Sequence, residues 1–493
     1  MEIDLISRLP AEAPVLVVGA HEGRRLTAAA EALDRRLGGR IRRAMAGGRF
    51  TGATGQHLDF VAPVGFDGRR VVLVGLGKAS ALAPLVVQDI GGRIETILAE
   101  FGEAEAVVAL DLPRDLPAYL GFGARLASQR FTKLRTRAQP GDPKPVRRLA
   151  VVAKSSAASA HSLARLEALA VGVGTARTLV NEPANLLGPD DFARRAGALK
   201  QLGVKVEVLD EKQLRRLGMG ALLAVGAGSV RRPRLLVLRW KGPKAKKGRG
   251  PIAFVGKGVV FDAGGIGIKK AEGMEAMKAD MAGAAAVVGV MQALALRKAP
   301  IEAVGVAALV ENMPSDTSYR PGDILKTMSG ETIEVVDTDA EGRLILSDAL
   351  YYTAKRFKPR AMMDLATLTY AVGAALGLHH AGVMSNDDGL ARRLIDAGEK
   401  TGERLWRLPL GPDYDANLDS TIADVRQVAP NDQTADAIHG AQLLQRFVGK
   451  IPWAHLDIAY TGMFALKEKP TQPKGATGFG VRLLDALVAS YES

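Results

Sequence analysis

The chain has 493 residues, more than one hydrophobic core usually supports, so we expect at least two domains. Hydrophobic residues make up 47% of it and charged residues 24%, a balance that excludes a mainly disordered protein. Cysteine is absent, which excludes disulfides, thiolate metal sites and a cysteine nucleophile, while a formal charge of +13 leaves binding of a polyanion open.

The first part of the chain predicts an α/β domain. Its short β-branched runs lie at residues 14–19, 70–75, 106–110 and 148–153. They alternate with segments of helical composition such as 26–37 and 116–128, and this spacing is typical of a largely parallel sheet covered by helices. The polar SSAASAHS stretch follows, so we define an N-terminal domain of residues 1–158.

A linker helix and a larger α/β domain are predicted for residues 159–493. A helical pattern runs from Leu163 towards Leu179. Strand-like runs then follow at 204–209, 232–240, 251–261, 301–310, 331–336, 360–368 and 453–459. The predicted fold class is therefore α/β, with two domains that each hold a mixed or mostly parallel sheet flanked by helices.

Two segments bear on the cellular location of the protein. Acidic residues stand near the N-terminus, where a secretory signal would carry basic ones. The most apolar helical stretch, Ala282 to Leu296, is rich in alanine and glycine and is too short to span a bilayer. We expect a cytoplasmic protein without a membrane span.

Charged residues interrupt apolar, glycine-rich backbone in two places. Lys257 and Asp262 lie in the strand-like run that leads into a glycine turn, and Asp280 follows at the entrance to an alanine-rich helix. Further along, Asp339, Glu341 and Arg343 occupy alternating positions, which would share one face of an extended backbone. Unpaired charges in such places would cost several kcal/mol, so a compensating partner is expected.

Two kinds of compensation fit these residues. The four carboxylates suit one or two divalent cations, because Mg²⁺ and Mn²⁺ prefer carboxylate oxygens and Zn²⁺ also accepts them. Alternatively, Lys257, Lys269 and Arg343 could neutralise the carboxylates in a buried ion-pair network. The residues alone favour neither reading over the other.

The segment that contains Asp339, Glu341 and Arg343 resembles a family signature. DTDAEGRL at 337–344 is close to the Asn-Thr-Asp-Ala-Glu-Gly-Arg-Leu motif of the leucyl aminopeptidases, two-metal exopeptidases of the cytosol aminopeptidase family. Other similar segments occur in the family's order: NEPANLL, GKGVVFD, YRPGDIL, MSG, DLATLT and WAHLDIA. The resemblance covers essentially residues 175–480, and it is weaker in the N-terminal domain, where VLVGLGK and ASQRFTKLRT carry it.

The resemblance implies that the C-terminal domain is the catalytic one, and it implies a metal-dependent mechanism and the residues that serve it. Two divalent ions, Mn²⁺ or Zn²⁺, would activate a bridging water, and two of the ligands, Asp262 and Glu341, would be shared between the ions. A lysine ligand must be neutral, so the ions would have to lower its pKa. The five implied metal ligands are Lys257, Asp262, Asp280, Asp339 and Glu341.

Other positions receive roles from the same resemblance. Lys269 would donate to the developing oxyanion, and Arg343 would hold a bicarbonate ion that passes a proton to the leaving amine. Met277 and Thr367 would line the pocket for the first side chain. The implied substrates are peptides with a free N-terminus that begin with leucine or another apolar residue, and the implied assembly is a homohexamer.

Three residues depart from the family pattern. Asp337 replaces the signature asparagine, Ala263 stands where serine or threonine is common, and Tyr370 replaces a glycine. The tyrosine would place a large ring near the substrate pocket. The metal ligand set is intact, so these departures bear mainly on specificity.

Two other functions stay open. The basic surface could serve a DNA-binding or scaffold role, which some bacterial members of this family have, although such a role would not need the metal ligands. A different two-metal hydrolase, such as a phosphoesterase, would use a similar carboxylate cluster. Metal-dependent release of an N-terminal residue would separate these alternatives.

Overall fold

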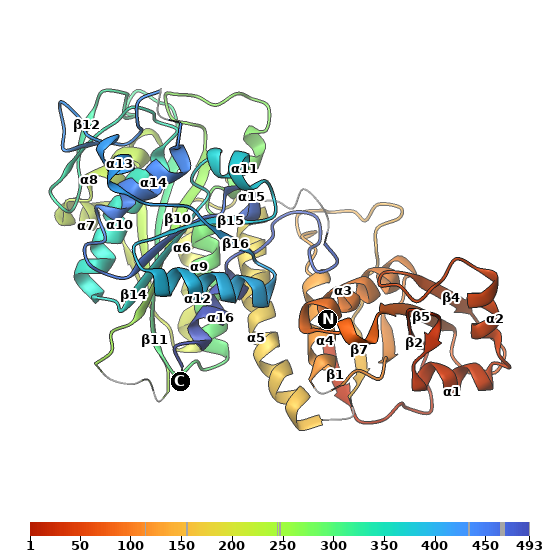
Figure 1. The fold of residues 1–493 in the computed structure, drawn as a ribbon. Coiled ribbons are helices and arrows are strands. Elements are labelled where there is room, and N and C mark those ends of the chain that lie inside the picture. The colour runs from red at the N-terminus through yellow and green to blue at the C-terminus, as the bar shows by residue number, and fades with distance from the viewer. Residues whose placement is uncertain are drawn as a thin grey trace. The chain divides into compact units, whose positions relative to one another are not determined.

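The computed structural model describes residues 1–113, 115–153, 156–243, 245, 248–431, 434–463 and 469–492. The chain divides into two compact units (Figure 1). The first comprises Met1–Ala170 and Lys467–Lys474, and the second comprises Val171–Leu466 and Gly475–Ser493. Our predicted border, after residue 158, lies near the start of helix α5 (Ser156–Asn181), whereas the division between the units falls within that helix.

The first unit is built on one mixed sheet whose strand order is β1-β7-β6-β2-β5-β4, with β3 beside β2. Neighbouring strands from β1 to β5 in this order run parallel, and β4 runs antiparallel to β5. The strands are β1 (Glu2–Ile6), β2 (Val15–His21), β3 (Arg25–Leu26), β4 (His57–Val61), β5 (Arg70–Gly77), β6 (Glu105–Ala109) and β7 (Arg148–Val152). The four predicted strands of this domain are therefore confirmed as β2, β5, β6 and β7.

Helices cover both faces of this sheet. On β5, Val72 and Val74 belong to the apolar cluster that contains residues of α3 (Pro84–Glu100) and α4 (Leu116–Ala127). The alternate residues Val71 and Leu73 belong to the cluster with α1 (Ala28–Arg36) and α2 (Arg40–Gly47). Because successive side chains of a strand point to opposite faces, this division places the two helix pairs on opposite sides.

The second unit carries a mixed sheet with the order β16-β15-β18-β14-β10-β11-β9-β8 and a small sheet with the order β12-β13-β17. Its centre, β18-β14-β10-β11, is parallel. The strands are β8 (Lys205–Leu209), β9 (Arg234–Lys241), β10 (Ile252–Asp262), β11 (Glu302–Asn312), β12 (Ile324–Lys326), β13 (Thr332–Glu334), β14 (Ala361–Ala366), β15 (Ala381–Ser385), β16 (Leu405–Arg407), β17 (Val425–Arg426) and β18 (Trp453–Asp457). The two-domain α/β fold class is confirmed.

Two buried helices pack against opposite faces of the central strands of this sheet. Val255 and Val259 of β10 pack in the cluster that contains Leu344 and Ile345 of α10 (Glu341–Phe357). Gly256, on the opposite face, lies against α9 (Ala282–Leu296), where an added Cβ would come within 2.5 Å of the Ala284 backbone. The flanking helices include α6 (Pro189–Ala196), α7 (Glu211–Leu217), α8 (Gly220–Val225), α11 (Ala371–Leu376), α12 (Asp388–Thr401), α13 (Pro412–Ala416), α14 (Asp436–Gln445), α15 (Ala459–Gly462) and α16 (Val481–Ala489).

The apolar segment around α9 is longer than the sequence indicated, because the short helix η4 (Met274–Ala279) precedes it. Met274–Leu296 has 23 residues and a mean hydropathy of 1.6 in its most apolar window, so its length and composition would allow it to cross a membrane. However, 89% of that window is buried within the protein, as in the core helix of a globular domain. We therefore assign α9 to the core of the second unit.

Candidate active site

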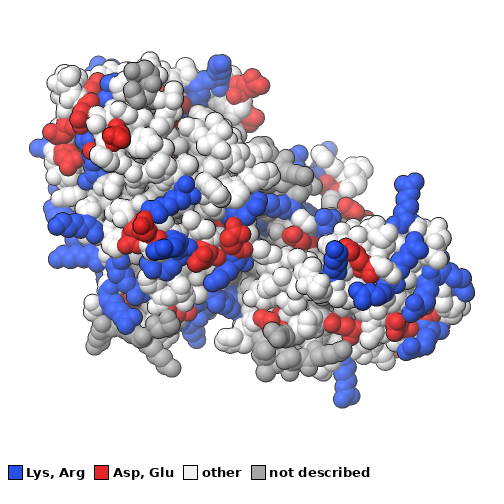
Figure 2. Space-filling view, viewed as in Figure 1, with Lys and Arg blue, Asp and Glu red and all other residues white. Residues whose placement is uncertain are grey.

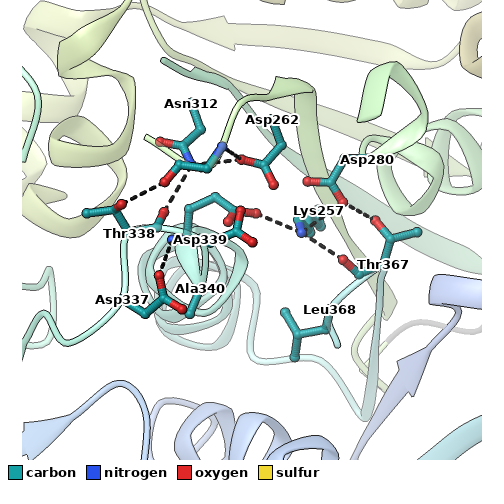
Figure 3. Close-up of polar contacts among 12 residues, drawn as sticks. Lys257, Asp262, Asp280, Asn312, Asp337, Thr338, Asp339, Ala340, Thr367 and Leu368 are labelled. Carbon is teal, nitrogen blue, oxygen red and sulfur yellow. Dashed lines mark hydrogen bonds and ion pairs between the residues drawn. The ribbon is translucent and has the colours of Figure 1, made fainter. Parts of the chain in front are cut away.

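The carboxyl ends of three central strands meet at one edge of the second sheet. β10 ends at Asp262, its neighbour β11 ends at Asn312, and β14 leads directly into Thr367. Ligands of open α/β sheets commonly bind outside these ends. Asp280, which follows η4, reaches the same place (Figure 3). Glu341, the first residue of α10, lies in the same cluster.

Three buried carboxylates form the centre of the site. Oxygen atoms of Asp262, Asp280 and Glu341 lie within 4.8 Å of one another, and no side chain of the three is more than 5% exposed. Burial, together with repulsion by the neighbouring carboxylates, raises the pKa of Asp280 well above its usual value and also raises that of Glu341. Burial and the nearby Asp262 raise the pKa of Asp339 to about 7. The cluster therefore resists carrying its full negative charge without a cation.

Two lysines face this cluster. The Lys257 ammonium lies 2.9 Å from Asp280 Oδ1 and 2.7 Å from Glu341 Oε1, and it donates to the Thr367 carbonyl. The Lys269 ammonium lies 2.8 Å from Asp262 Oδ2 and also pairs with Asp339. Burial alone would lower the pKa of each lysine, but the attraction of the carboxylates is stronger and raises it.

The two lysines do not neutralise the negative charge of the site. Asp262, Asp280, Asp339 and Glu341 carry four carboxylates against two ammonium groups, which leaves a deficit of positive charge. Among the described residues, the buried oxygens Asp280 Oδ2 and Glu341 Oε2 also have no hydrogen-bond partner. A donor set of several carboxylates with unsatisfied oxygens fits divalent cations better than it fits a closed ion-pair network.

Neighbouring groups fix the orientation of the carboxylates. Asn312 donates from Nδ2 to Asp262 Oδ1 at 2.8 Å and to the Thr338 carbonyl at 3.0 Å, and Thr367 donates to Asp280 Oδ1 at 2.5 Å. The turn after β10 has positive φ at Gly264 (+88°), and this turn allows the chain to bring Lys269 back to the cluster. No sequence motif singled out Asn312, whose only signal is an amide at the end of an apolar strand.

Asp337, a departure from the family signature, has a structural task that asparagine could also perform. Its Oδ1 accepts a hydrogen bond from the Asp339 backbone N–H at 2.9 Å (Figure 3). An asparagine side chain offers the same acceptor. The additional charge therefore leaves the local turn intact.

Arg343 does not pair with the carboxylates of the site, as a buried ion-pair network would require. Its side chain is buried, Nη1 donates to the Gln427 carbonyl at 2.8 Å, and Nη2 pairs with the carboxylate of Asp436. Asp436 begins α14, nearly a hundred residues away in sequence, and none of the motifs indicated it. Arg343 thus faces the site without neutralising Asp339 or Glu341.

A cavity of about 240 Å³ opens over these residues. Glu341 is buried and does not line the cavity, whereas the other predicted site residues do: Lys257, Asp262, Lys269, Met277, Asp280, Asp339, Arg343 and Thr367. Tyr370 also lines the cavity, with its hydroxyl 3.5 Å from Lys269 Nζ and 62% of the residue exposed. Its ring therefore borders the cavity and is not part of the apolar core.

Comparison with known proteins identifies the family of the chain. The family described as "Cytosol aminopeptidase family, catalytic domain" matches residues 174–485, and its N-terminal domain matches residues 17–138. A probable cytosol aminopeptidase of Caulobacter vibrioides is 49% identical over 97% of this chain and 96% of its own length. One from Brucella melitensis is 52% identical over 89% of this chain and 90% of its own length.

Two solved structures share the whole fold. A tomato leucine aminopeptidase variant is 32% identical, with a TM-score of 0.87 over 99% of this chain and 96% of that one. The bottromycin maturation enzyme BotP, in complex with Mn, is also 32% identical, with a TM-score of 0.83 over 98% of this chain and 100% of that one. These matches cover both units, so the chain belongs to the cytosol aminopeptidase family and is an aminopeptidase.

Proposed function

We propose that the enzyme is a two-metal aminopeptidase that releases an N-terminal leucine or another apolar residue from peptides. The observation that carries this proposal is the buried cluster of Asp262, Asp280 and Glu341, which holds more negative charge than the adjacent lysines offset. The structure of BotP in complex with Mn, a protein of the same fold, supports Mn²⁺ as one candidate metal, and Zn²⁺ is the other.

Five side chains would hold the two ions: Lys257, Asp262, Asp280, Asp339 and Glu341. Two bound divalent cations would supply a water that is deprotonated near neutral pH and would polarise the scissile carbonyl. Lys257 would have to release its proton, which the positive charge of the ions favours. Its Nζ is already directed at Asp280 and Glu341, so the amine would need little movement to join them as a ligand.

Other residues would orient the peptide. Lys269 Nζ lies at the cavity and would donate to the carbonyl oxygen as it becomes anionic. Met277 and Thr367 also line the cavity and would contact the first side chain. Because the cavity is small, it suits a single side chain at the end of a peptide.

Hydrolysis of leucine p-nitroanilide tests the proposed function. We expect turnover with Mn²⁺ or Zn²⁺, its loss after complete chelation, and its return when metal is added back. Hydrolysis of p-nitrophenyl phosphate with the same metals, without release of an amino acid, would support the phosphoesterase alternative instead. Full peptidase activity in protein shown by elemental analysis to lack metal would contradict the proposal.

The DNA-binding alternative has no specific observation in its favour. On the face shown in Figure 2, lysine and arginine side chains are scattered and mixed with acidic ones. A net charge of +13 on a chain of 493 residues would by itself give weak, salt-dependent attraction to polyanions. We therefore propose peptides, and not nucleic acid, as the partners of the site.

We also propose a cytoplasmic homohexamer, because the family resemblance implies that assembly and the matched relatives are named as cytosol aminopeptidases. Static light scattering of the purified full-length chain should give six times the mass of one chain. A stable monomer at micromolar concentration would contradict the hexamer and would leave the proposed chemistry of the second unit untouched.

Tyr370 should influence the choice of the first residue. Its ring borders the cavity where the family has a glycine, so Tyr370→Gly should enlarge the space and shift the leucine-to-alanine ratio of kcat/KM towards leucine. One methylene in an apolar pocket is worth about 1–3 kcal/mol, so we expect a change of about tenfold or more. Tyr370→Phe removes only the hydroxyl near Lys269 and serves as the matched control. An unchanged ratio in an active Tyr370→Gly enzyme would show that the ring does not limit the pocket.

A further inference from the structure

One buried carboxylate near the site is not among the proposed metal ligands. Asp457 is the last residue of β18, is fully buried, and does not line the cavity. It lies opposite Ala366 of the parallel strand β14, at the carboxyl edge of the sheet where the candidate site is found. A buried carboxylate is costly unless its oxygens accept hydrogen bonds, so its donors show which parts of the chain it holds in place.

The hydrogen-bond donors to Asp457 belong to residues that line the cavity. Its Oδ1 accepts from the backbone N–H of Leu368 and from that of Ala459, each at 3.2 Å. Its Oδ2 accepts from the Thr369 hydroxyl at 2.7 Å. Leu368 and Thr369 follow β14, whereas Ala459 begins α15 after β18, and all three line the cavity. A single side chain therefore ties together two parts of the cavity wall.

The Thr369 hydroxyl extends this support to the next helix. It accepts a hydrogen bond from the Val372 backbone N–H at 3.3 Å while it donates to Asp457. Val372 lies in the first turn of α11, where backbone N–H groups have no partner within the helix. Tyr370, whose ring borders the cavity, stands between the two residues. Asp457 thus restrains the backbone before Tyr370 directly and the backbone after it through Thr369.

Thr367, in contrast, is held by the proposed metal ligands. Its hydroxyl donates to Asp280 Oδ1 at 2.5 Å, and its carbonyl accepts from Lys257 Nζ at 2.7 Å (Figure 3). These contacts do not depend on Asp457. Replacing Asp457 should therefore release the cavity wall while the ligand cluster stays in place.

We propose that Asp457 is a positioning residue of the aminopeptidase reaction. Its carboxylate fixes the wall formed by Leu368, Thr369 and Ala459, against which the first residue of the peptide is placed, and it acts without touching substrate or metal. This inference rests on the proposed function, in which the cavity takes that residue. A misplacement of about 1 Å caused by a change far from the reacting atoms can cost about 100-fold in rate.

Steady-state kinetics with leucine and alanine p-nitroanilide test the proposal. Asp457→Ala should lower kcat/KM for the leucine substrate by about 10- to 100-fold, mainly through a higher KM. It should also narrow the leucine-to-alanine ratio, because a wall that is no longer held fits the larger side chain less closely. Asp457→Asn should recover most of the loss, since its amide oxygen can still accept from Leu368 and Ala459. Elemental analysis should find the parental metal content in both variants.

Asp348→Ala is the matched control. Asp348 is another fully buried carboxylate of the second unit, it accepts from the backbone N–H groups of Leu222 and Met328, and it does not line the cavity. Each alanine substitution leaves buried donors without their acceptor, so both should lower the melting temperature. Only Asp457→Ala should change KM and the leucine-to-alanine ratio.

Thr369→Val keeps the proposal testable if Asp457→Ala does not fold. It removes the donor to Asp457 Oδ2 and the acceptor for Val372. A more apolar wall would by itself favour leucine, whereas loss of the restraint should shift the ratio towards alanine. A shift towards alanine is therefore the expected result.

Three results would overturn the proposal. The first is a parental KM and leucine-to-alanine ratio in folded Asp457→Ala or, where that variant does not fold, a ratio in Thr369→Val that stays unchanged or moves towards leucine. The second is an equal change of KM in Asp348→Ala. The third is loss of bound metal from Asp457→Ala, which would place its effect on the ligand cluster. Failure of the proposed function is distinguishable from all three, because the metal-loaded parent would then release no amino acid.

Discussion

Asp339→Ala and Glu341→Ala should each abolish aminopeptidase turnover and lower the metal content below two ions per chain. Each change removes a proposed ligand from a site whose other groups are held in place by hydrogen bonds, so no nearby oxygen can replace it. The Glu341 oxygens are buried, and a methyl group there would leave a void and an incomplete ligand set.

Asp337→Asn is the matched control for this experiment. It also removes one negative charge from the same loop, but it keeps the acceptor for the Asp339 backbone N–H and restores the signature residue. It should retain both metal ions and turnover. Elemental analysis and the metal-dependent rise in melting temperature, which reports binding to the folded state, measure the difference. Two equivalents of metal and parental turnover in both alanine variants would contradict the ligand assignment.

Lys269→Met should lower kcat by about 100- to 1000-fold, the loss seen when one oxyanion donor is removed, while metal content stays at the parental level. Methionine keeps the length of the side chain but offers no proton to the carbonyl oxygen. In the structure Lys269 also offsets Asp262 and Asp339. Without metal, the melting temperature of the variant should therefore lie below that of the parent. With metal bound, the difference should be smaller, because the cations then offset the charge of Asp262 and Asp339.

Lys270→Met controls for the loss of a neighbouring positive charge. Lys270 is exposed and does not line the cavity, so the change should leave kcat within a few-fold of the parent. Single-turnover and steady-state assays at saturating metal separate an effect on chemistry from one on binding. If Lys269→Met retained parental kcat, Lys269 would not be the electrophile.

The sequence predicted the central strands well because they are buried on both faces. Runs such as 251–261 and 301–310 are almost continuously apolar, and they became β10 and β11. β1 and β4 were missed because both lie at the edges of their sheet and mix polar with apolar residues. Their pairing depends on the neighbouring strand more than on their own composition.

The site was predictable wherever its residues lie within one motif. Asp339, Glu341 and Arg343 share a single octapeptide, so the resemblance selected them together. The extended backbone that we expected for these three residues was wrong, because helix α10 already begins at Glu341. Asn312 and Asp436 could not be found in this way. They enter the site through the alignment of β11 with β10 and through the placement of α14, both of which are tertiary features.

The packing of α9 has a consequence for how quickly the enzyme exchanges its metals. A Cβ added at Gly283 would lie 2.0 Å from the Leu365 carbonyl, so the start of this helix rests directly on the strand that leads to Thr367. Asp280, just before the helix, also accepts a hydrogen bond from the Thr367 hydroxyl, so its backbone and its carboxylate are both held at the site. Metal uptake should therefore occur in one kinetic phase, at a rate set by how fast each hydrated ion sheds water and not by a rearrangement of the chain.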